Sequence, residues 1–268
     1  MDWNQALVLG IVQGLTEFLP ISSTAHLRIV PQLLDWQDPG TEFSAVIQLG
    51  TLMAVMLYFW NDIVSLSRAA ITSLLNRRLF ETSDAKLAWS ILAATIPIVV
   101  LGLGFKDFIK SDARELRLIG IALIILAIGL YAAERLSHLN RNISQLKFIQ
   151  IQLIGLTQAL ALIPGCSRSG SAIMGGLILG LKREEAARFS FLLGIPAILG
   201  SGIYELAELW VKGINSSDYL NLIVGILASF VVGYISIEFL LRFLKIHGTL
   251  IFVIYRVVLG TGVLVFLV

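Results

Sequence analysis

Two short polar segments interrupt long apolar stretches of this chain, at residues 14–26 and 163–171. Each contains one proline, Pro20 or Pro164, and carries charged and hydroxyl side chains where a lipid-facing helix would carry Leu or Val. A charged side chain in hydrocarbon costs roughly 2.5 to 3.5 kcal/mol even on mild insertion scales, so such residues usually face a protein-lined or watery cavity. The rest of the sequence must therefore form a scaffold that encloses both segments.

The composition is that of an integral membrane protein. Of the 268 residues, 57% are hydrophobic and only 14% are charged, whereas about 25% of the residues of a soluble domain are charged. The formal net charge of +2 and the lack of a run of Lys and Arg give no indication of nucleic-acid binding. Cys166 is the only cysteine, so the chain cannot form an internal disulfide.

Apolar stretches long enough to cross a membrane need about 20 mainly apolar residues. Six stretches predict an all-α, polytopic membrane protein: 43–60, 88–105, 116–136, 186–208, 220–243 and 250–268. Two further apolar regions, about 4–34 and 148–181, are each broken by one of the polar segments. Because irregular backbone at membrane depth needs protein or water to satisfy it, we predict that each of these regions forms a re-entrant helical hairpin with its tip near the midplane.

The two halves of the sequence show an internal repeat. Gly14–Glu17 recurs as Gly155–Gln158, and in each copy a proline and a hydroxyl cluster follow. Lys and Arg are in excess in the loops on the side that begins after residue 60, so the positive-inside rule places that side in the cytoplasm. The hairpins then enter from opposite sides. We predict one membrane domain, 1–268, made of inverted halves 1–136 and 148–268, with the binding site where the halves meet.

The first polar segment contains a candidate acid–nucleophile group. Gln13 and Glu17 are four residues apart, so they lie on one helix face and can share a ligand. The carboxylate of Glu17 can hold a divalent cation or orient a nearby histidine. Hydroxyl residues Ser22–Thr24 follow at a predicted helix start, and His26 lies three residues beyond Ser23. A serine near a histidine is the minimum for an activated nucleophile. The alternatives are helix capping by the hydroxyls and a purely structural hydrogen bond for Glu17 or His26.

The second polar segment has the features of an anion-binding loop. Gly165 and Gly170 allow close approach of the backbone, and Ser167 and Ser169 offer hydroxyl hydrogen bonds. The planar guanidinium of Arg168 matches phosphate oxygens. A helix that starts near Gly170 adds free N–H groups at its N-terminus.

A second cation, Arg256, lies inside the last apolar stretch with no acidic residue beside it in sequence. It is either a further phosphate ligand or one partner of a structural ion pair. The candidate partners for such a pair are Glu134, Glu205 and Glu238.

Together these residues resemble the signatures of the bacterial undecaprenyl pyrophosphate phosphatase family, also called the bacitracin-resistance family. The resemblance covers essentially the whole chain and is carried by Gln13 with Glu17, Pro20–His26, Pro164–Gly170 and Ile254–Arg256. Three residues depart from the usual family pattern: Gln13 replaces a commoner glutamate, Ala25 stands where glycine is usual, and Cys166 stands where an aromatic residue is common.

The resemblance implies hydrolysis of undecaprenyl pyrophosphate to the monophosphate, in support of peptidoglycan synthesis, and resistance to bacitracin. It implies a multi-pass protein of the bacterial cytoplasmic (inner) membrane, with an active site open to the periplasmic or outer face. A divalent cation, Mg²⁺ or Ca²⁺, is the implied cofactor. By position, Glu17, Ser23, His26 and Arg168 match catalytic residues, and Gln13 and Glu17 match metal ligands. The implied substrate-binding residues are Ser22, Thr24, Ser167, Ser169, Gly170 and Arg256.

Several alternatives stay open at the level of the sequence. The nucleophile is Ser23 activated by His26, His26 itself, or a water molecule activated by His26. Inverted halves with broken helices are also the plan of secondary transporters, so a transporter or flippase of a lipid phosphate or anion is the competing function. Small residues such as Gly225, Ala228 and Ser229 can serve helix packing within one subunit or between two subunits, so a homodimer is possible.

Overall fold

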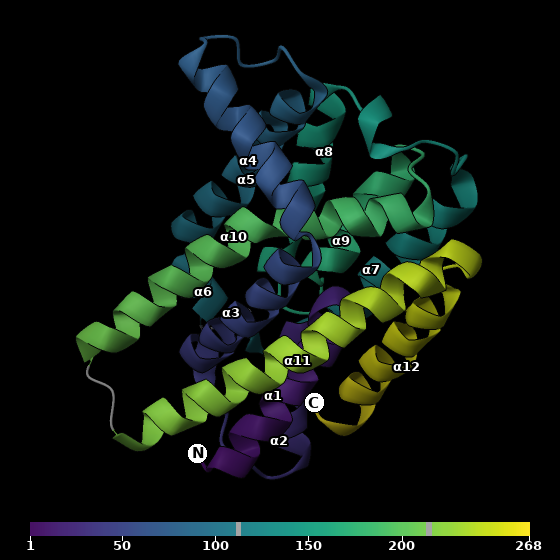
Figure 1. The fold of residues 1–268 in the computed structure, drawn as a ribbon. Coiled ribbons are helices and arrows are strands. Elements are labelled where there is room, and N and C mark those ends of the chain that lie inside the picture. The colour runs from purple at the N-terminus through teal and green to yellow at the C-terminus, as the bar shows by residue number, and fades with distance from the viewer. Residues whose placement is uncertain (111–113, 213–215) are drawn as a thin grey trace.

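The computed structural model describes residues 1–110, 114–212 and 216–268, and this part of the chain is helical apart from one isolated β-bridge between Arg141 and Leu181 (Figure 1). The all-α prediction is therefore confirmed. The helical elements are α1 (Trp3–Phe18), α2 (Ser23–Leu33), α3 (Gly40–Tyr58), α4 (Trp60–Leu75), α5 (Ser83–Gly104), α6 (Lys106–Lys110), α7 (Leu116–Leu136), η2 (Ile143–Gln145), α8 (Phe148–Gln158), η3 (Ala159–Leu162), α9 (Arg168–Ile178), α10 (Arg183–Lys212), α11 (Ser216–Ile246) and α12 (Leu250–Phe266).

Within the described residues, five helices are long and apolar enough to cross a membrane, which indicates a multi-pass membrane protein. They are α3, α5, α7, the Arg183–Glu208 part of α10 and the Tyr219–Ile246 part of α11, and each overlaps one of the predicted stretches. The sixth predicted stretch, 250–268, forms α12, which is apolar but has only 17 residues.

Helix α4 was not predicted from the sequence. It follows α3 directly, and Ser73 is its only buried residue. Asn61, Asp62 and Arg68 interrupt its apolar residues, so it has no continuous apolar stretch of spanning length. In Figure 1 it extends from the body of the molecule at the end opposite to the two chain termini.

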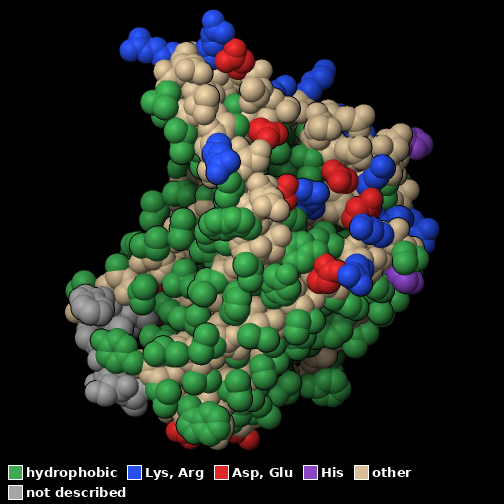
Figure 2. All heavy atoms as spheres, viewed as in Figure 1, with side chains coloured by type: hydrophobic (Ala, Val, Ile, Leu, Met, Phe, Trp, Pro, Cys, Tyr) green, Lys and Arg blue, Asp and Glu red, His purple; other side chains and the backbone are tan. Residues whose placement is uncertain are grey.

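The outer surface separates by chemistry along the molecule. Figure 2 shows hydrophobic side chains over the middle and lower part, where α10 and α11 lie, and most of the visible charged side chains near the upper end. Leu199 of α10 and Ile223 and Leu227 of α11 are among the exposed apolar residues. A surface of this kind is suited to lipid contact along the helices and to water at the charged end.

The two broken regions each form a helical hairpin. The first hairpin consists of α1 and α2, and the second hairpin consists of α8, η3 and α9. Helix α1 packs against α11, whereas α8 packs against α5. A Cβ atom on Gly14 would lie 2.7 Å from Cβ of Val232 in α11, and one on Gly155 would collide with the carbonyl oxygen of Ala94 in α5. Gly14 and Gly155, which are equivalent in the internal repeat, thus allow each hairpin to pack closely against a long neighbouring helix.

The small residues of α11 are used for packing inside the chain. A Cβ atom on Gly10 of α1 would lie 2.5 Å from the carbonyl oxygen of Gly225 and 2.8 Å from Cβ of Ala228. The hydroxyl of Ser229 donates to the carbonyl of Ile47 in α3, with an oxygen–oxygen distance of 2.7 Å. These contacts hold α1 and α3 against α11 and thereby fix the first hairpin in the body of the protein.

Candidate active site

Both hairpins turn through a serine with left-handed backbone. Ser22 has φ 74° and Ser167 has φ 64°, a conformation that is uncommon for residues other than glycine. Each serine then caps the next helix: Ser22 Oγ accepts from the backbone N–H of Ala25 at 3.3 Å, and Ser167 Oγ accepts from that of Gly170 at 3.1 Å. The capping interpretation is therefore confirmed for Ser22, and Ser167, for which no cap was predicted, caps α9 in the same way, so the N-termini of α2 and α9 start from equivalent turns.

The hydroxyl pairs of the two turns are also equivalent. Ser22 Oγ lies 3.1 Å from Thr24 Oγ1, and Ser167 Oγ lies 3.1 Å from Ser169 Oγ. Ser169 Oγ also donates to the carbonyl of Leu19 at 3.1 Å, which joins the second hairpin to the loop of the first. The predicted pocket hydroxyls therefore lie together at the two hairpin tips.

The carboxylate of Glu17 is the centre of the candidate site. Its Oε2 atom accepts from Ser23 Oγ at 2.6 Å and from Gln13 Nε2 at 2.8 Å, and its Oε1 atom accepts from Arg168 Nη2 at 2.9 Å. Glu17 and Ser23 are 5% and 8% exposed. A single buried carboxylate thus joins a hydroxyl of the first hairpin to a guanidinium that lies 151 residues away in the sequence.

His26 is held by different partners. Its Nδ1 atom lies 2.7 Å from the carbonyl oxygen of Ser22, and its Nε2 atom lies 2.6 Å from the hydroxyl of Tyr255. The two rings stack with a centroid distance of 5.6 Å. Because a carbonyl only accepts, Nδ1 carries a hydrogen and Nε2 of the neutral ring accepts from Tyr255. Ser23 donates to Glu17, so the structure does not join Ser23 to His26.

Tyr255 was missed as a site residue by reasoning from side-chain chemistry. The only sequence signal was its place beside Arg256 in the Ile254–Arg256 signature. Its contact with His26 spans 229 residues of sequence, so local spacing could not reveal it.

Arg256 is completely buried and donates only to backbone carbonyls in the part of the chain that the structure describes. Nε donates to Leu123 and Nη1 to Pro20, both at 3.1 Å. Nη2 donates to Gly165 at 2.7 Å and to Ala122 at 3.5 Å.

The ion-pair alternative for Arg256 is wrong, because the acids proposed as its partners bind other groups. Glu134 pairs with Arg183 at 2.5 Å and accepts from the backbone of Thr249. Glu238 contacts Tyr58 and Arg242. Glu205 lies in an acidic cluster with Glu42 and Glu208.

Two buried amide side chains have polar atoms without a hydrogen-bond partner. Gln13 donates to Glu17, but its Oε1 atom accepts from no donor among the described residues. Gln158, at the end of α8, is completely buried, and both its Oε1 and Nε2 atoms are unpartnered there. In the internal repeat Gln158 corresponds to Glu17. Buried unpaired polar groups are rare in folded proteins and point to water, an ion or a ligand as the missing partner.

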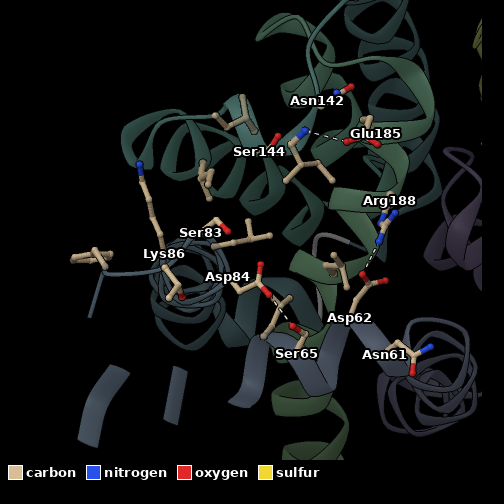
Figure 3. Close-up of a pocket in the computed structure, with 18 of the residues that line it drawn as sticks. Asn61, Asp62, Ser65, Ser83, Asp84, Lys86, Asn142, Ser144, Glu185 and Arg188 are labelled. Carbon is tan, nitrogen blue, oxygen red and sulfur yellow. Dashed lines mark hydrogen bonds and ion pairs between the residues drawn. The ribbon is translucent and has the colours of Figure 1, made fainter. Parts of the chain in front are cut away.

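A separate cavity of about 670 Å³ lies between α4, α5, η2 and α10 (Figure 3). Arg188 pairs with Asp62 at 2.6 Å, and Ser65 donates to Asp84 at 2.7 Å across its wall. None of Glu17, Ser23, His26 and Arg168 lines this cavity. It is therefore a second polar region, distinct from the hairpin tips.

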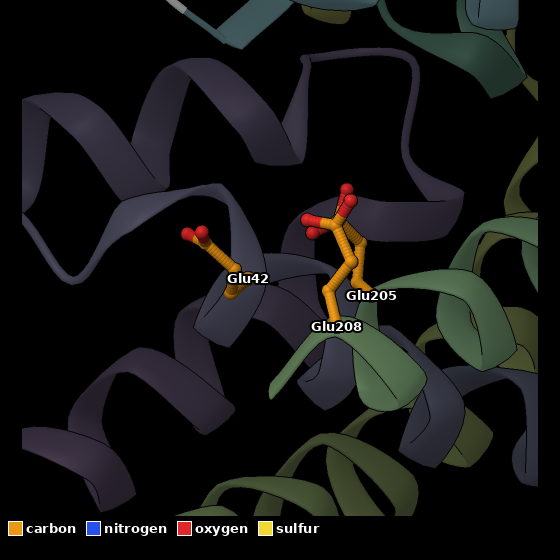
Figure 4. Close-up of side chains that lie close together, drawn as sticks. All are labelled: Glu42, Glu205 and Glu208. Atoms are coloured by element: carbon orange, nitrogen blue, oxygen red, sulfur yellow. The ribbon is translucent and has the colours of Figure 1, made fainter. Parts of the chain in front are cut away.

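Glu42, Glu205 and Glu208 form an acidic cluster in which one ligand atom of each residue lies within 4.8 Å of the others (Figure 4). Lys106 forms an ion pair with Glu208 at 2.6 Å. Hydrogen bonds with Glu208 and Tyr204 raise the pKa of Lys106 above its usual value. The positive charge of Lys106 offsets part of the negative charge of this cluster. None of the three glutamates was a predicted site residue.

Comparison with known proteins identifies relatives along the whole chain. Residues 6–262 match the family described as "Bacitracin resistance protein BacA". The chain is 51% identical over 275 residues to a protein of Chloroherpeton thalassium, covering 100% of the chain and 97% of the relative. It is 52% identical over 272 residues to one of Prosthecochloris aestuarii, covering 98% and 96%. A protein of Myxococcus xanthus is 51% identical over 267 residues, covering 100% and 90%. All three relatives are described as undecaprenyl-diphosphatase.

Proposed function

The chain belongs to the bacitracin resistance protein BacA family, and we propose that the cluster around Glu17 is the active site with which it hydrolyses undecaprenyl pyrophosphate. The products are undecaprenyl phosphate and inorganic phosphate. The reaction returns the lipid carrier to peptidoglycan synthesis and confers resistance to bacitracin. The observation that carries the assignment of the site is the carboxylate of Glu17, which accepts from Ser23 and from Arg168 at the same time.

Ser23 is the proposed nucleophile and Glu17 is its general base. The hydroxyl already donates to Oε2 of Glu17 at 2.6 Å, which is the geometry that proton transfer requires. Ser23 Oγ bonds to the terminal phosphorus, its proton passes to Glu17, and the bond from that phosphorus to the bridging oxygen breaks. Undecaprenyl phosphate leaves and takes the proton from Glu17, and a phosphoserine remains. Water, deprotonated by the carboxylate of Glu17, then attacks the phosphoserine; the bond between Ser23 Oγ and phosphorus breaks, inorganic phosphate leaves, and Ser23 takes the proton back from Glu17.

Arg168 and the N-termini of two helices stabilise the charge that develops on the phosphates. The guanidinium of Arg168 presents a planar donor pair that matches phosphate oxygens. Helices α2 and α9 begin beside Ser23 and Arg168 with free N–H groups and the positive ends of their dipoles. Ser22, Thr24, Ser167, Ser169 and the backbone of Gly170 are proposed to line the headgroup pocket, while the isoprenoid chain stays in the lipid.

A rapid-quench experiment tests the nucleophile. Substrate labelled in the terminal phosphate is mixed with the enzyme, quenched within one turnover, and digested. We expect an acid-stable phosphoserine that is absent from the Ser23→Ala variant. An acid-labile adduct lost in His26→Ala would instead identify His26 as the nucleophile. The lack of any adduct would favour direct attack by water, with Glu17 or His26 as its base.

The residues near Glu17 fit a divalent cation such as Mg²⁺ or Ca²⁺. The unpartnered Oε1 atom of Gln13 is a buried acceptor beside a carboxylate, and oxygen donors are what both ions prefer. Gln13 and Glu17 would hold the ion, which would supply positive charge to the phosphates. The test is activity after treatment with a chelator, followed by addition of each metal, in the wild type and in Gln13→Leu. We expect the variant to need a higher metal concentration.

We further propose six membrane-spanning helices and two re-entrant hairpins in an inverted repeat, with halves 1–136 and 148–268. The equivalent turns at Ser22 and Ser167 support this arrangement. The packing of α1 on α11 also supports it, because α8 packs on α5 in the corresponding way. Exchanging the two halves converts one of these contacts into the other. The proposed location is the bacterial inner membrane, with the active site open to the outer face.

Single-cysteine labelling of intact cells, with Cys166 replaced by alanine, tests the orientation. Gln37→Cys lies between α2 and α3, and Asn76→Cys follows α4; both residues are exposed. We expect an impermeant maleimide to label the first variant and to leave the second unlabelled until the cells are opened. The reverse pattern would place the active site on the cytoplasmic face.

The competing function is a transporter or flippase of a lipid phosphate or anion. Purified protein in detergent separates the two functions, because a hydrolase releases inorganic phosphate from a polyprenyl pyrophosphate without any membrane. Uptake by vesicles without hydrolysis would support the transporter. A homodimer also remains a proposal, and crosslinking of the protein in native membranes tests it.

A further inference from the structure

Arg256 lies where the loops of the two hairpins meet. Its Nη1 atom donates to the carbonyl of Pro20 in the first loop, and its Nη2 atom donates to the carbonyl of Gly165 in the second loop. Nε and Nη2 also donate to carbonyls of α7, at Leu123 and Ala122. The side chain of Arg256 in α12 therefore connects both loops to α7.

We infer that Arg256 is a positioning residue that holds the two loops in register, so that Ser23 and Arg168 both reach Glu17. The inference rests on the proposed active site. In the first loop the carbonyl bound by Arg256 belongs to residue 20, and the reactive side chain belongs to residue 23. In the second loop these are residues 165 and 168. Arg256 thus binds each loop three residues before the side chain, Ser23 or Arg168, that the loop places against Glu17.

The chemistry of the guanidinium explains why arginine suits this position. Loop carbonyls enclosed in a membrane protein need donors from the protein, because the hydrocarbon supplies none. Arginine carries five N–H donors in a rigid planar fork, so one side chain can satisfy carbonyls from three segments. Lysine carries its three donors on one nitrogen atom and cannot reproduce that span.

This role differs from direct binding of phosphate. To become a phosphate ligand, Nη1 or Nη2 would have to leave a loop carbonyl, and the loop would then lose the bond that fixes it. Arg256 is completely buried, and its three nitrogen atoms all have carbonyl acceptors. Its charge strengthens the attraction for a diphosphate from a distance, while its hydrogen bonds fix the backbone.

The native thiol of Cys166 reports on the loop. Cys166 follows Gly165 directly, is the only cysteine of the chain and is 7% exposed. In Arg256→Lys we expect N-ethylmaleimide to label Cys166 about tenfold faster than in the wild type, because the loop opens more often. We expect kcat to fall roughly 100-fold, the cost typical of misplaced catalytic groups. KM should change less than about threefold, since no substrate contact is removed.

Two control variants separate the possible outcomes. Arg242→Lys changes an exposed guanidinium on α11 and should alter neither labelling nor turnover. Ser23→Ala should abolish turnover and leave the labelling rate unchanged. If Ser23→Ala keeps its turnover, the proposed active site fails, whereas the labelling of Arg256→Lys still decides whether Arg256 holds the loop.

A measurement on the wild type avoids any effect of substitution on folding. Methylenediphosphonate, a diphosphate that cannot be hydrolysed, is added before N-ethylmaleimide. A positioning role predicts that Cys166 is labelled at the same rate or more slowly, because the loops stay fixed. Faster labelling with the diphosphonate, or an Arg256→Lys variant with KM raised more than about tenfold and kcat and labelling unchanged, would overturn the inference and make Arg256 a phosphate ligand.

Discussion

Ser23 and Arg168 occupy the same position in the two hairpins, since each follows the left-handed serine that caps the next helix. Their chemistry is opposite: one is a hydroxyl and the other is a cation. The contrast continues in the last turns of α1 and α8, because α1 carries Glu17 where α8 carries Gln158. The same backbone turn therefore presents the proposed nucleophile and its proposed base in the first hairpin, and the proposed phosphate-binding charge in the second.

The comparison separates what the backbone supplies from what the side chains supply. Both turns provide a helix N-terminus, which favours anions whatever the residue at its start. Only the first hairpin provides a carboxylate at the tip, and only the second provides a guanidinium that reaches it. Five substitutions test this division of roles, from the largest expected effect to the smallest.

The largest effect is expected for Glu17→Gln. The amide removes the proton acceptor of Ser23 and the negative partner of Arg168, so we expect kcat to fall by about 10³-fold or more. The measurement is phosphate release in detergent, with Glu81→Gln, an exposed residue of the loop before α5, as the control. A loss smaller than about tenfold would show that the first hairpin does not supply the base.

Arg168→Lys should lose roughly 100-fold in kcat/KM, although the charge is kept, because one ammonium cannot reproduce the planar fork. Arg78→Lys, at a position that is 72% exposed, should be silent. Near-normal turnover of the Arg168 variant would mean that the second hairpin supplies only charge, and that the geometry of its cation is unimportant.

Tyr255→Phe removes the hydroxyl that donates to Nε2 of His26 and keeps the stacked ring. If His26 takes part in the reaction, we expect a decrease of about tenfold in kcat, since the orientation of its ring is lost while the other groups stay. Tyr131→Phe, on an exposed part of α7, is the matched control. An unaltered rate in Tyr255→Phe would indicate that His26 is a structural residue of the first hairpin.

Gln158→Leu tests whether the second hairpin also contributes an amide to the site. We expect the melting temperature to stay the same or rise, because a buried amide without a hydrogen-bond partner lowers the free energy of unfolding by about 1 to 3 kcal/mol. We expect kcat/KM to fall about threefold if the missing partner comes with the substrate. A lowered melting temperature together with full activity would instead assign Gln158 to the packing of α8.

The smallest effect is expected for Asp38→Asn, in the segment that follows the first hairpin. After the first hairpin, Asp38 binds Arg114 at 2.6 Å and Arg28 at 3.5 Å. After the second, the backbone of Arg141 bonds to Gly180 and Lys182 instead. Burial opposes ionisation of Asp38, but hydrogen bonds from Arg114 and Gly40 and the charge of Arg28 lower its pKa below the usual value.

A carboxyl group with a lowered pKa stabilises the fold above its unfolded pKa, and this contribution is lost as the pH falls through the folded pKa. We therefore expect Asp38→Asn to lower the melting temperature by about 2 °C at neutral pH. The difference from the wild type should shrink below about pH 4. A melting-temperature difference that stays constant over this range would show that the charge of Asp38 does not stabilise the segment after the first hairpin.

Much of the scaffold could be predicted from the sequence, because the bilayer restricts the possible folds. The apolar stretches located five long helices and α12, and the prolines at 20 and 164 located the two breaks. Helix α4 was missed because its polar residues leave no long apolar stretch. Hydroxyls at a helix start predicted the cap at Ser22, whereas the cap at Ser167 was not predicted.

The partners within the site were harder to predict, for two physical reasons. Spacing along a helix placed His26 near Ser23, but the imidazole binds the carbonyl of Ser22, and Ser23 turns back toward Glu17. The acceptors of Arg256 are backbone carbonyls, and every residue has one. A sequence therefore shows that a buried cation needs partners without showing which partners it has.

The bond between Glu17 and Arg168 has a consequence for selectivity. In the proposed site, Oε1 of Glu17 accepts from the guanidinium of Arg168 that an incoming phosphate would engage, while Oε2 accepts from Ser23. A headgroup must displace this carboxylate oxygen from Arg168 before Arg168 can bind it. A diphosphate, with more negative charge to offer than the phosphodiester of a bulk phospholipid, is better able to do so. In the proposed site, the pairing of Glu17 with Arg168 would thus disfavour the phosphodiester headgroups of the surrounding membrane.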